Sequence, residues 1–495
     1  MNMHAPTGPA ARSDKPPLAV DLDGTLIRCD LFIESMLRFV FSAPWKAPLL
    51  AAWLMRGRAH AKAQLAARDE IDAATLPYDE RLVAWLVEER ANGRTIVLAT
   101  ASDQRAAQAV ADHLGVFDAV FASDGETNLK SSRKAARLGE AYPQGFVYAG
   151  NEGADIRVWR AAKQAVVANA SSGLARRASR EFEVERSFAP THNPLMAFVR
   201  AIRPQQWSKN LLVFLPMLVG QGWSEPQTWI AAFLAFWALS FIASSVYLVN
   251  DAADIDADRA HPRKKRRPFA SGALSPAVGL AAAIVFAAIG VGFAVSANVL
   301  ALVLVYLTAT TLYTFVLKRI VLVDVFLLAG LYTIRIVIGG AATGYFASDW
   351  LLAFSCFFFL SLALVKRVAE TREMAARGGG ALNRRGYLSD DTYVLTMMGV
   401  GSGAIAALVL ALYLQDAENA ARFSEPFLLW AMPATIIFWI YRVWLKTHRG
   451  EMHDDPIVFA VRDRTSWVVA GFAALFFAAA ALLPPGALAA LGLGR

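Results

Sequence analysis

Four aspartates lie close together at the end of a long apolar stretch, in the segment NDAADIDAD that starts at Asn250. On an α-helix, which turns by about 100° per residue, Asp251, Asp254 and Asp258 fall within about 60° of one another, and Asn250 lies on the same side. Three carboxylates on one face repel each other unless a cation joins them, and oxygen ligands suit Mg²⁺. Because Mg²⁺ bridges diphosphates, the spacing predicts a site for magnesium and a diphosphate leaving group.

A simpler interpretation of this segment is an acidic helix cap in a loop, which would explain one or two of the aspartates. It does not explain three aspartates in phase beside Asn250, while Asp256 points away from them. The basic run His261–Arg267 follows. Part of this run is an anchor at the membrane surface, and we expect Arg267 in RRPFASG to contact phosphate.

A second group of polar residues follows apolar runs in the N-terminal part of the chain. Asp21 and Asp23 come directly after the apolar PLAV, and Thr100 ends a second predicted strand in TIVLATAS. Lys134 begins the helical KAARL, and Asp155 follows a strand predicted in FVYAGNEGADIRVW. Strands that alternate with helices predict a parallel α/β sheet, with functional residues at the carboxyl ends of the strands.

Basic residues also lie inside or at the edges of long apolar runs, namely Lys209, Lys318, Arg335, Lys366 and Arg367. A charge at the centre of a membrane costs about 2.5–3.5 kcal/mol on insertion scales and is usually functional. We therefore expect these cations to bind anionic substrates. Two alternatives stay open. Arg335 could form a buried pair with Asp324 in the same span or with another residue, and Lys209 and Lys366 could be interfacial anchors.

The elements that position these groups divide into two parts. The chain has 495 residues, of which 56% are hydrophobic and 18% charged, which is too apolar for an ordinary soluble enzyme. Residues 1–190 predict a soluble α/β domain with a small helical cap, and residues 191–495 predict an all-α transmembrane bundle. The apolar runs of the bundle suggest nine spans, near 210–222, 228–249, 276–297, 299–317, 320–342, 349–367, 393–414, 425–445 and 465–488.

Loop charge predicts the orientation of the bundle. The loops after the second, fourth, sixth and eighth spans are rich in lysine and arginine, whereas the intervening loops carry only Arg422. The positive-inside bias then places the N-terminal domain and the acidic motif in the cytoplasm. The net charge of +8 follows from these loops, and no pattern of a nucleic-acid-binding module is present. We expect a lipid bilayer as a partner and no nucleic acid.

The membrane part resembles the UbiA superfamily of intramembrane prenyltransferases over roughly residues 195–490. NDAADIDAD fits that superfamily's NDxxDxxxD motif, and RPFASG fits the segment that follows it. The resemblance implies magnesium at the aspartates and a substrate-binding role for Asn250. It also implies that Tyr313 and Lys318 bind substrate, although the superfamily usually places this tyrosine and lysine one residue closer together.

Three segments, RPQQWSKN, YLVNDAADIDADRAHP and LVKRVAETRE, resemble the bacterial decaprenyl-phosphate phosphoribosyltransferase branch of the superfamily. Those enzymes take phosphoribosyl pyrophosphate and a polyprenyl phosphate, and they release pyrophosphate. The resemblance implies these two substrates and a multi-pass protein of the bacterial inner membrane. Both substrates are anionic, which agrees with the cations in the apolar runs.

The soluble part resembles the haloacid dehalogenase-like phosphatases over roughly residues 17–185, with the DxDGT motif at Asp21 and Asp23. The resemblance implies that Asp21 is a nucleophile that becomes an aspartyl phosphate and that Asp23 is the general acid and base. It also implies that Asp21, Asp23 and Asp155 hold magnesium.

The same resemblance implies that Thr100 and Lys134 hold the phosphoryl oxygens, with Lys130 as the alternative to Lys134. One position departs from the pattern, because the family usually has aspartate where this chain has Asn151. The missing carboxylate could weaken metal binding, so the resemblance leaves open a fold that is retained without catalysis. The apolar stretch 31–55 is expected to be either the core of the cap or a patch on the membrane.

The sequence thus predicts a bifunctional enzyme that transfers 5-phosphoribosyl to a polyprenyl phosphate and then removes the 5-phosphate. A second hypothesis is a UbiA-type prenyltransferase that moves a prenyl group from prenyl diphosphate to an aromatic or lipid acceptor, with an accessory phosphatase. A third hypothesis, a transporter or scaffold with a regulatory domain, gives no reason for the aspartate motif. The oligomeric state is left open, a homo-oligomer included.

Overall fold

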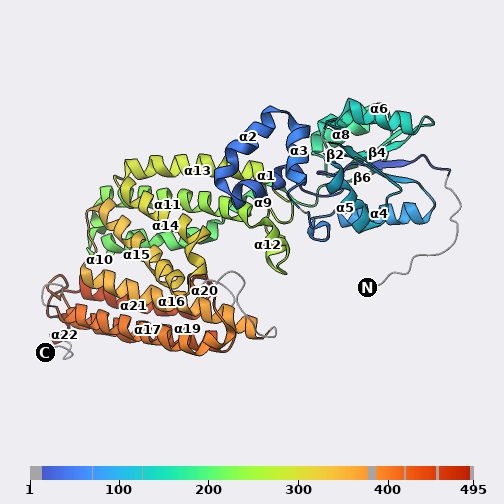
Figure 1. Ribbon diagram of the computed structural model, residues 1–495. Helices are drawn as coiled ribbons and strands as arrows, with labels where there is room; N and C mark the ends of the chain where they lie inside the picture. Colours follow the sequence, from blue (N-terminus) through green and yellow to red (C-terminus); the bar gives the residue numbers. More distant parts are fainter. Residues whose placement is uncertain are drawn as a thin grey trace. The chain divides into compact units, whose positions relative to one another are not determined.

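The computed structural model describes residues 14–69, 71–124, 126–376, 386–416, 420–452 and 456–490 (Figure 1). The chain divides into two compact units. The first comprises Met1–Ile202 and Tyr247–Ala282, and the second comprises Arg203–Val246 and Ala283–Arg495. The acidic motif therefore belongs to the same unit as the N-terminal domain, whereas the boundary expected near residue 190 assigns it to the membrane bundle.

The first unit contains a six-stranded sheet with the strand order β3-β2-β1-β4-β5-β6. Every neighbouring pair is parallel, which confirms the predicted α/β class. The order runs outward from β1 to β3 on one side and from β4 to β6 on the other, so the sheet has its switch point between β1 and β4. The strands are β1 (Leu18–Val20), β2 (Ile96–Asp103), β3 (Ala119–Ser123), β4 (Val147–Gly150), β5 (Gln164–Ala168) and β6 (Val184–Phe188).

Helices cover both faces of this sheet (Figure 1). One face carries α4 (Glu80–Ala91) and α5 (Gln104–Leu114), and the other carries α6 (Ser132–Ala141) and α8 (Ser172–Glu181). Side chains of β1 alternate between the two cores, because Leu18 and Val20 pack on the first side and Ala19 on the second. Burial on both faces explains why the central strands β1 and β4 are uninterrupted apolar runs.

Three helices form the predicted cap, namely α1 (Leu31–Ser42), α2 (Ala47–Met55) and α3 (Arg58–Ala66). Leu50, Trp53 and Leu65 are buried together in a small core that the apolar side of α1 completes. Trp45 and Met55 are 77% and 83% exposed. The apolar stretch 31–55 is therefore partly the core of the cap and partly an exposed apolar surface.

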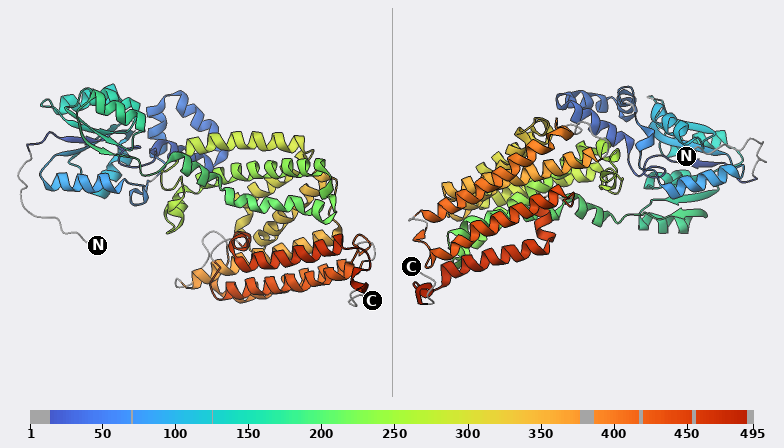
Figure 2. Two further views of the ribbon diagram at one scale, coloured as in Figure 1. Left: turned by 180° about the vertical axis from the view of Figure 1, so that it is seen from behind. Right: turned by 90° about the horizontal axis from the view of Figure 1, so that it is seen from below.

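Among the described residues, seven helices are long and apolar enough to cross a membrane, and the chain is a multi-pass membrane protein. Figure 2 shows the long helices of the bundle running side by side. These helices are α11 (Pro226–Ala253), α13 (Pro276–Ser296), α15 (Val323–Thr343), α16 (Asp349–Ala375), α17 (Thr392–Gln415), α19 (Ala431–His448) and α21 (Arg464–Leu482), with the shorter apolar α14 (Leu300–Phe315). Shorter helices are α7 (Ile156–Trp159), α9 (Pro194–Ile202), α12 (Ile255–Arg259), α20 (Pro456–Arg462) and α22 (Ala487–Ala490).

The first expected span, 210–222, is not one long helix. Residues Pro204–Phe214 form a 3₁₀-helix, η4, and only Leu215–Val219 form an α-helix, α10. Left-handed backbone at Arg203 and Gln221 bounds the segment on both sides. The other expected spans correspond to the helices given above.

Close helix packing in the second unit depends on small residues. Gly399 of α17 lies against the Trp444 ring of α19, and a Cβ at this position would overlap that ring. Ser361 of α16 donates a hydrogen bond to the Gly399 carbonyl oxygen at 2.7 Å and accepts one from the Trp444 indole at 3.0 Å. Three helices therefore meet at one satisfied polar group in an otherwise apolar core.

Candidate active sites

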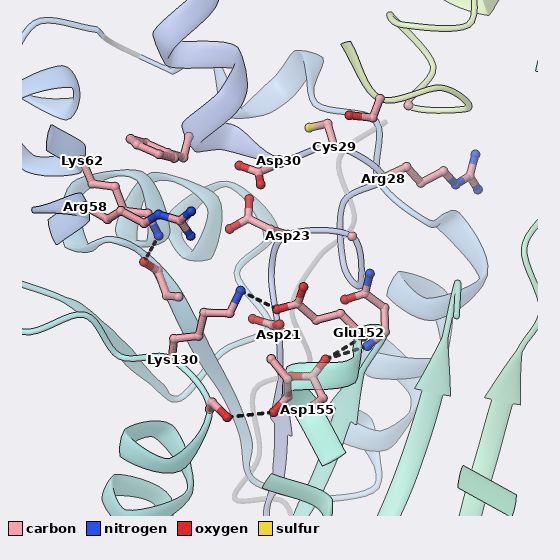
Figure 3. A pocket seen from close by; sticks show the side chains of 18 of the residues that line it. Asp21, Asp23, Arg28, Cys29, Asp30, Arg58, Lys62, Lys130, Glu152 and Asp155 are labelled. Carbon is pink, nitrogen blue, oxygen red and sulfur yellow. Dashed lines mark hydrogen bonds and ion pairs between the residues drawn. The ribbon is translucent and has the colours of Figure 1, made fainter. Parts of the chain in front are cut away.

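A pocket of about 330 Å³ lies in the first unit, at the carboxyl ends of β1 and β4 (Figure 3). This is the switch point of the sheet, where open α/β folds bind ligands. The volume is within the usual range for small-molecule sites. The predicted residues Asp21, Asp23, Lys134 and Asp155 all line the pocket.

Asp21 is nine-tenths buried and is held by Lys134. The Lys134 ammonium donates a hydrogen bond to Asp21 Oδ1 at 2.8 Å and a second to the Tyr148 hydroxyl at 2.7 Å. Tyr148 in turn donates to Asp155 Oδ1 at 2.9 Å. Burial raises the pKa of Asp21, although Lys134 opposes this shift. Lys130 instead pairs with Glu152 at 2.8 Å, so Lys134 is the lysine that contacts the predicted nucleophile.

Asp23 lies beside Asp21 in the pocket and accepts hydrogen bonds on both carboxylate oxygens. The donors are the Leu31 amide at 2.9 Å and the Ser102 hydroxyl at 2.5 Å. Burial, reinforced by the charge of Asp30, raises the pKa of Asp23 to about 6. Such a carboxyl can release and accept a proton near neutral pH, as a general acid and base must.

Thr100 does not line the pocket. Strand β2 extends to Asp103 rather than ending at Thr100, and the Thr100 side chain is fully buried and accepts a hydrogen bond from the Ser102 amide. Ser102, two residues further along, contacts Asp23. Sequence analysis missed both Ser102 and Tyr148, and the serine in TIVLATAS was the available signal for the first.

Asp155 is buried, and its carboxylate receives several donors. Oδ2 accepts hydrogen bonds from the amides of Asn151 and Glu152, each at 2.9 Å. Burial raises the pKa of Asp155 to about 6, with a further contribution from the charge of Asp21. The Asn151 amide oxygen accepts a hydrogen bond from Thr25 at 3.1 Å.

The oxygen donors of this pocket are of the type that Mg²⁺ prefers. Among the described residues, no group of three or more His, Cys, Asp or Glu side chains is arranged to hold a metal ion. Mg²⁺ at phosphate-binding sites usually takes one or two carboxylates together with water and substrate oxygens, so a pair of carboxylates is a sufficient protein contribution. Asp21 and Asp155 fit that requirement.

The acidic motif interrupts a helix. Helix α11 ends at Ala253 and α12 begins at Ile255, yet the amides of Asp254 and Asp258 still donate to the carbonyl oxygens four residues earlier, at 3.0 and 2.8 Å. Asp254 itself has non-helical backbone angles, so the motif is a helix with a break and not the single straight helix that the spacing argument assumed.

Asp251 and Asp258 meet at one cation. Their side chains are buried, and Nη1 of Arg267 lies 3.2 Å from Asp251 and 2.7 Å from Asp258. The predicted convergence of these two carboxylates is therefore present, and Arg267 supplies the positive charge between them. Asp256 points elsewhere, as expected from its phase, and pairs with Arg38 at 2.7 Å.

In the second unit, Arg335 is buried within a group of neutral polar side chains. Its Nε donates to Asn210 Oδ1 and its Nη2 donates to the Tyr306 hydroxyl, each at 2.9 Å. The guanidinium also lies 5.4 Å from the ring centre of Tyr332, and the ammonium of Lys209 lies 5.4 Å from the same ring. Two of the predicted cations are thus gathered around Tyr332.

The alternative pairing of Arg335 with Asp324 is wrong. Asp324 lies 2.7 Å from Nε of Arg367 and accepts a hydrogen bond from Tyr387 at 2.5 Å. Arg367 is fully buried and also contacts Glu370. The positive charge of Arg367 is balanced by these carboxylates inside the bundle. The sequence predicted that Arg367 binds a substrate, whereas the structure pairs it with residues of the protein.

The remaining predicted substrate-binding residues of the second unit lie on α14, on the 3₁₀-helix that follows it and on α16. The Tyr313 hydroxyl of α14 accepts a hydrogen bond from Arg367 at 3.4 Å. Lys318 lies on the 3₁₀-helix η7 (Leu317–Arg319), which follows α14, and Lys366 precedes Arg367 on α16. Sequence analysis missed Asn210, Tyr306 and Tyr332. Neither tyrosine belongs to a recognised motif.

Residues 211–379 match the UbiA prenyltransferase family. The protein y4nM of Sinorhizobium fredii is 37% identical over 468 residues, which are 94% of this chain and 90% of that protein, so residues of both units have counterparts there. The decaprenyl-phosphate phosphoribosyltransferase of Mycobacterium tuberculosis is 31% identical over 301 residues, which cover 58% of this chain and 97% of that protein. A solved structure of a UbiA homolog from Archaeoglobus fulgidus, bound to GPP and Mg²⁺, covers 57% of this chain and 97% of its own with 17% identity and a TM-score of 0.43. The chain belongs to the UbiA prenyltransferase family.

Proposed function

We propose that this protein is a bifunctional membrane enzyme that makes polyprenyl-phosphoryl ribose. The bundle transfers 5-phosphoribosyl from phosphoribosyl pyrophosphate to a polyprenyl phosphate, and the N-terminal domain removes the 5-phosphate. The similarity to the decaprenyl-phosphate phosphoribosyltransferase of Mycobacterium tuberculosis over 97% of that protein carries the proposal. The protein would lie in the bacterial inner membrane with its N-terminal domain in the cytoplasm, in agreement with the basic loops.

For the transfer step, Asp251 and Asp258 would hold magnesium together with pyrophosphate oxygens, and Asp254 of the same motif remains a predicted ligand. When bound, magnesium would neutralise the pyrophosphate leaving group. Arg267 contacts two of these carboxylates and would bind a pyrophosphate oxygen. Asn250 would orient the same group.

The polyprenyl phosphate is an anion, and Arg335 is suited to bind it. The groups that contact the Arg335 guanidinium are neutral, so its positive charge is not cancelled by a carboxylate. Lys209 adds a second charge beside Tyr332. Tyr313, Lys318 and Lys366 remain predicted contributors to substrate binding.

For the hydrolytic step, an Asp21 oxygen attacks the 5-phosphate and the bond from phosphorus to the ribose oxygen breaks. Asp23 gives its proton to the departing ribose oxygen. It then accepts a proton from the water that cleaves the aspartyl phosphate, so that inorganic phosphate leaves and both carboxyl groups return to their initial state. Lys134 stabilises the negative charge of the phosphoryl oxygens, and magnesium held by Asp21 and Asp155 would do the same.

The presence of a phosphatase-like pocket favours ribosyl transfer over prenyl transfer. A prenylated aromatic product has no phosphate monoester, whereas a polyprenyl-phosphoryl phosphoribose has one on the ribose. The match to the prenyltransferase family supports the second candidate, which is transfer of a prenyl group from prenyl diphosphate to an aromatic or lipid acceptor.

The decisive experiment supplies membranes that contain the protein with either of two substrate pairs. One pair is labelled phosphoribosyl pyrophosphate and polyprenyl phosphate, and the other is labelled prenyl diphosphate and 4-hydroxybenzoate. We expect a labelled ribosyl lipid from the first pair and none in membranes that carry Asp251→Asn. A prenylated aromatic without any ribosyl lipid would establish the second candidate.

A further inference from the structure

The phosphatase-like pocket is not built from the N-terminal domain alone. The segment Phe269–Pro276, which directly follows the acidic motif, supplies part of its lining through Phe269, Gly272, Leu274, Ser275 and Pro276. Gly272 has a φ of +71° and lies so close to the loop after Asp21 that a Cβ there would be 2.5 Å from the Arg28 carbonyl oxygen. The segment therefore packs against the backbone of the nucleophile loop as a wall of the pocket.

One buried arginine fixes this wall in place. Nη2 and Nη1 of Arg259, on α12, donate to the two carboxylate oxygens of Glu34 at 2.6 and 2.8 Å, and Nε donates to the Ala270 carbonyl oxygen at 3.0 Å. Both side chains are at most 3% exposed. A planar guanidinium with all three nitrogens engaged gives a defined geometry, so α12, the cap helix α1 and the wall segment are held together.

The position of the wall connects the pocket to the membrane part of the chain. Pro276 lines the pocket and is also the first residue of α13, a helix of 21 residues that is apolar enough to cross a membrane. The wall is therefore continuous in sequence with a helix long and apolar enough to span a membrane, which favours a substrate that is itself anchored in a bilayer. A freely soluble sugar phosphate would need no such wall.

The cap supplies a second place in the pocket where an anion can bind. Arg58 and Lys62 lie one turn apart on α3 and both line the pocket. Figure 3 shows them extending side by side toward the region of Asp23 and Asp30. Lys62 donates a hydrogen bond to the Ala101 carbonyl oxygen at 2.5 Å, which fixes its ammonium at the pocket. The hydrolytic step described above uses neither cation.

We propose that the pocket binds a lipid-linked sugar phosphate at two points. Its terminal phosphate lies at Asp21, its bridging phosphodiester lies at Arg58 and Lys62, and the wall Phe269–Pro276 selects this substrate over soluble sugar phosphates. This inference rests on the proposed function, because polyprenyl-phosphoryl 5-phosphoribose carries both phosphates on one ribose. Arg58 and Lys62 are binding residues here, and Arg259 is a positioning residue that acts through the wall.

The test uses the full chain in nanodiscs and two supplied substrates, synthetic polyprenyl-phosphoryl 5-phosphoribose and ribose 5-phosphate. Phosphate release gives kcat/KM for each. We expect the wild type to prefer the lipid-linked substrate, and we expect the double variant Arg58→Gln with Lys62→Gln to lower that preference by about tenfold or more, mainly through KM. Arg56→Gln, which removes an exposed arginine of the same cap that does not line the pocket, is the matched control.

The wall is tested with a glycine pair. Gly272→Ala should lower the preference for the lipid-linked substrate, because the new methyl group displaces the wall from Arg28. Gly173→Ala, where a Cβ meets nothing within 4 Å, should leave the preference as in the wild type. Thermal unfolding of both variants shows whether the first effect is a general loss of structure.

The outcomes separate this inference from the proposed function. If the wild type hydrolyses both substrates equally well with Asp21, or if the double variant loses activity equally on both, the two-point pocket is wrong while the phosphatase stands. If neither supplied substrate is hydrolysed in an Asp21-dependent reaction, the phosphatase itself is wrong and the inference fails with it.

Discussion

Asp23 shows how burial and hydrogen bonding compete at one carboxyl group. The Leu31 amide and the Ser102 hydroxyl both favour its charged form. Burial outweighs them and raises the pKa from 3.8 to about 6. The folded protein therefore binds this proton more tightly than the unfolded chain does.

This shift predicts the pH dependence of stability. Because the folded pKa is the higher one, the stabilisation from protonated Asp23 is complete below about pH 4 and is lost as the pH rises through about 6. Asp23→Asn has no such loss, so its melting temperature relative to that of the wild type should rise by about 2 °C or more between pH 4 and pH 8. Thermal unfolding across this pH range measures the difference, and a constant difference would contradict the shift.

The two buried arginines of the second unit differ in the charge around them, which gives opposite predictions. Arg335→Met removes a cation that contacts neutral groups, so the transferase should lose about tenfold or more in kcat/KM for polyprenyl phosphate. Its loss of stability should be smaller than that of Arg367→Met, because only neutral groups lose a hydrogen-bond donor. Arg367→Met leaves the buried Asp324 without its partner, so it should destabilise the protein by about 3–5 kcal/mol. Acceptor kinetics and thermal unfolding of both variants distinguish the roles. Unchanged acceptor kinetics in Arg335→Met would make Arg335 structural.

At the scale of elements, the acidic motif spans the break between α11 and α12, which lies at Asp254. Asp251 and Asp258 converge on Arg267, whereas Asp256 faces the cap and pairs with Arg38. A change at either of the first two removes charge from the proposed metal site, whereas a change at Asp256 removes an ion pair with Arg38 of the cap.

We therefore expect Asp251→Asn and Asp258→Asn each to lower ribosyl transfer by about a hundredfold or more. Asp256→Asn, an identical chemical change two residues before Asp258, should retain most of the activity. The assay is formation of labelled ribosyl lipid in membranes with equal amounts of each variant. Similar losses at all three positions would show that phase along the helix does not decide the role.

The packing of α16, α17 and α19 makes a separate prediction about glycines. Gly399→Ala should destabilise the protein by about 1–3 kcal/mol, because its methyl group would overlap the Trp444 ring. Gly401→Ala is the control, since a Cβ at that position meets nothing within 4 Å. Thermal unfolding in one detergent compares them, and equal melting temperatures would show that the helices separate without cost.

For the whole molecule, the proposed activities should be separable by one substitution. Asp21→Asn removes the anionic oxygen that attacks phosphorus, while the acidic motif at Asp251–Asp258 is unchanged. The variant should accumulate polyprenyl-phosphoryl 5-phosphoribose, and the wild type should yield the dephosphorylated ribose lipid. Mass spectrometry of extracted lipids distinguishes them by one phosphate. The same phosphorylated lipid from both proteins would show that the N-terminal domain does not act on it. Asn151→Asp would then be the first variant to test for a gain of phosphatase activity.

The sequence by itself predicted the parallel sheet and all but the first of the membrane helices, and it placed the aspartates of both motifs directly after apolar runs. Each of these follows from composition, periodicity or spacing along a short window, which local backbone geometry converts directly into structure. It failed at 210–222, because Pro216 lies inside this apolar run and left-handed backbone at Arg203 and Gln221 bounds the segment that contains it. A criterion of length and hydropathy does not register these features.

Only the tertiary structure decided which groups meet across the chain. It chose Lys134 over Lys130 as the partner of Asp21 and Arg367 over Arg335 as the partner of Asp324. It also brought the Ser102 hydroxyl to Asp23, a contact that the sequence did not predict. It further brought Glu34 to Arg259, 225 residues away. This contact helps to place the segment Phe269–Pro276 in the wall of the pocket at Asp21. Such pairings depend on how whole elements pack, and no local pattern in the sequence encodes them.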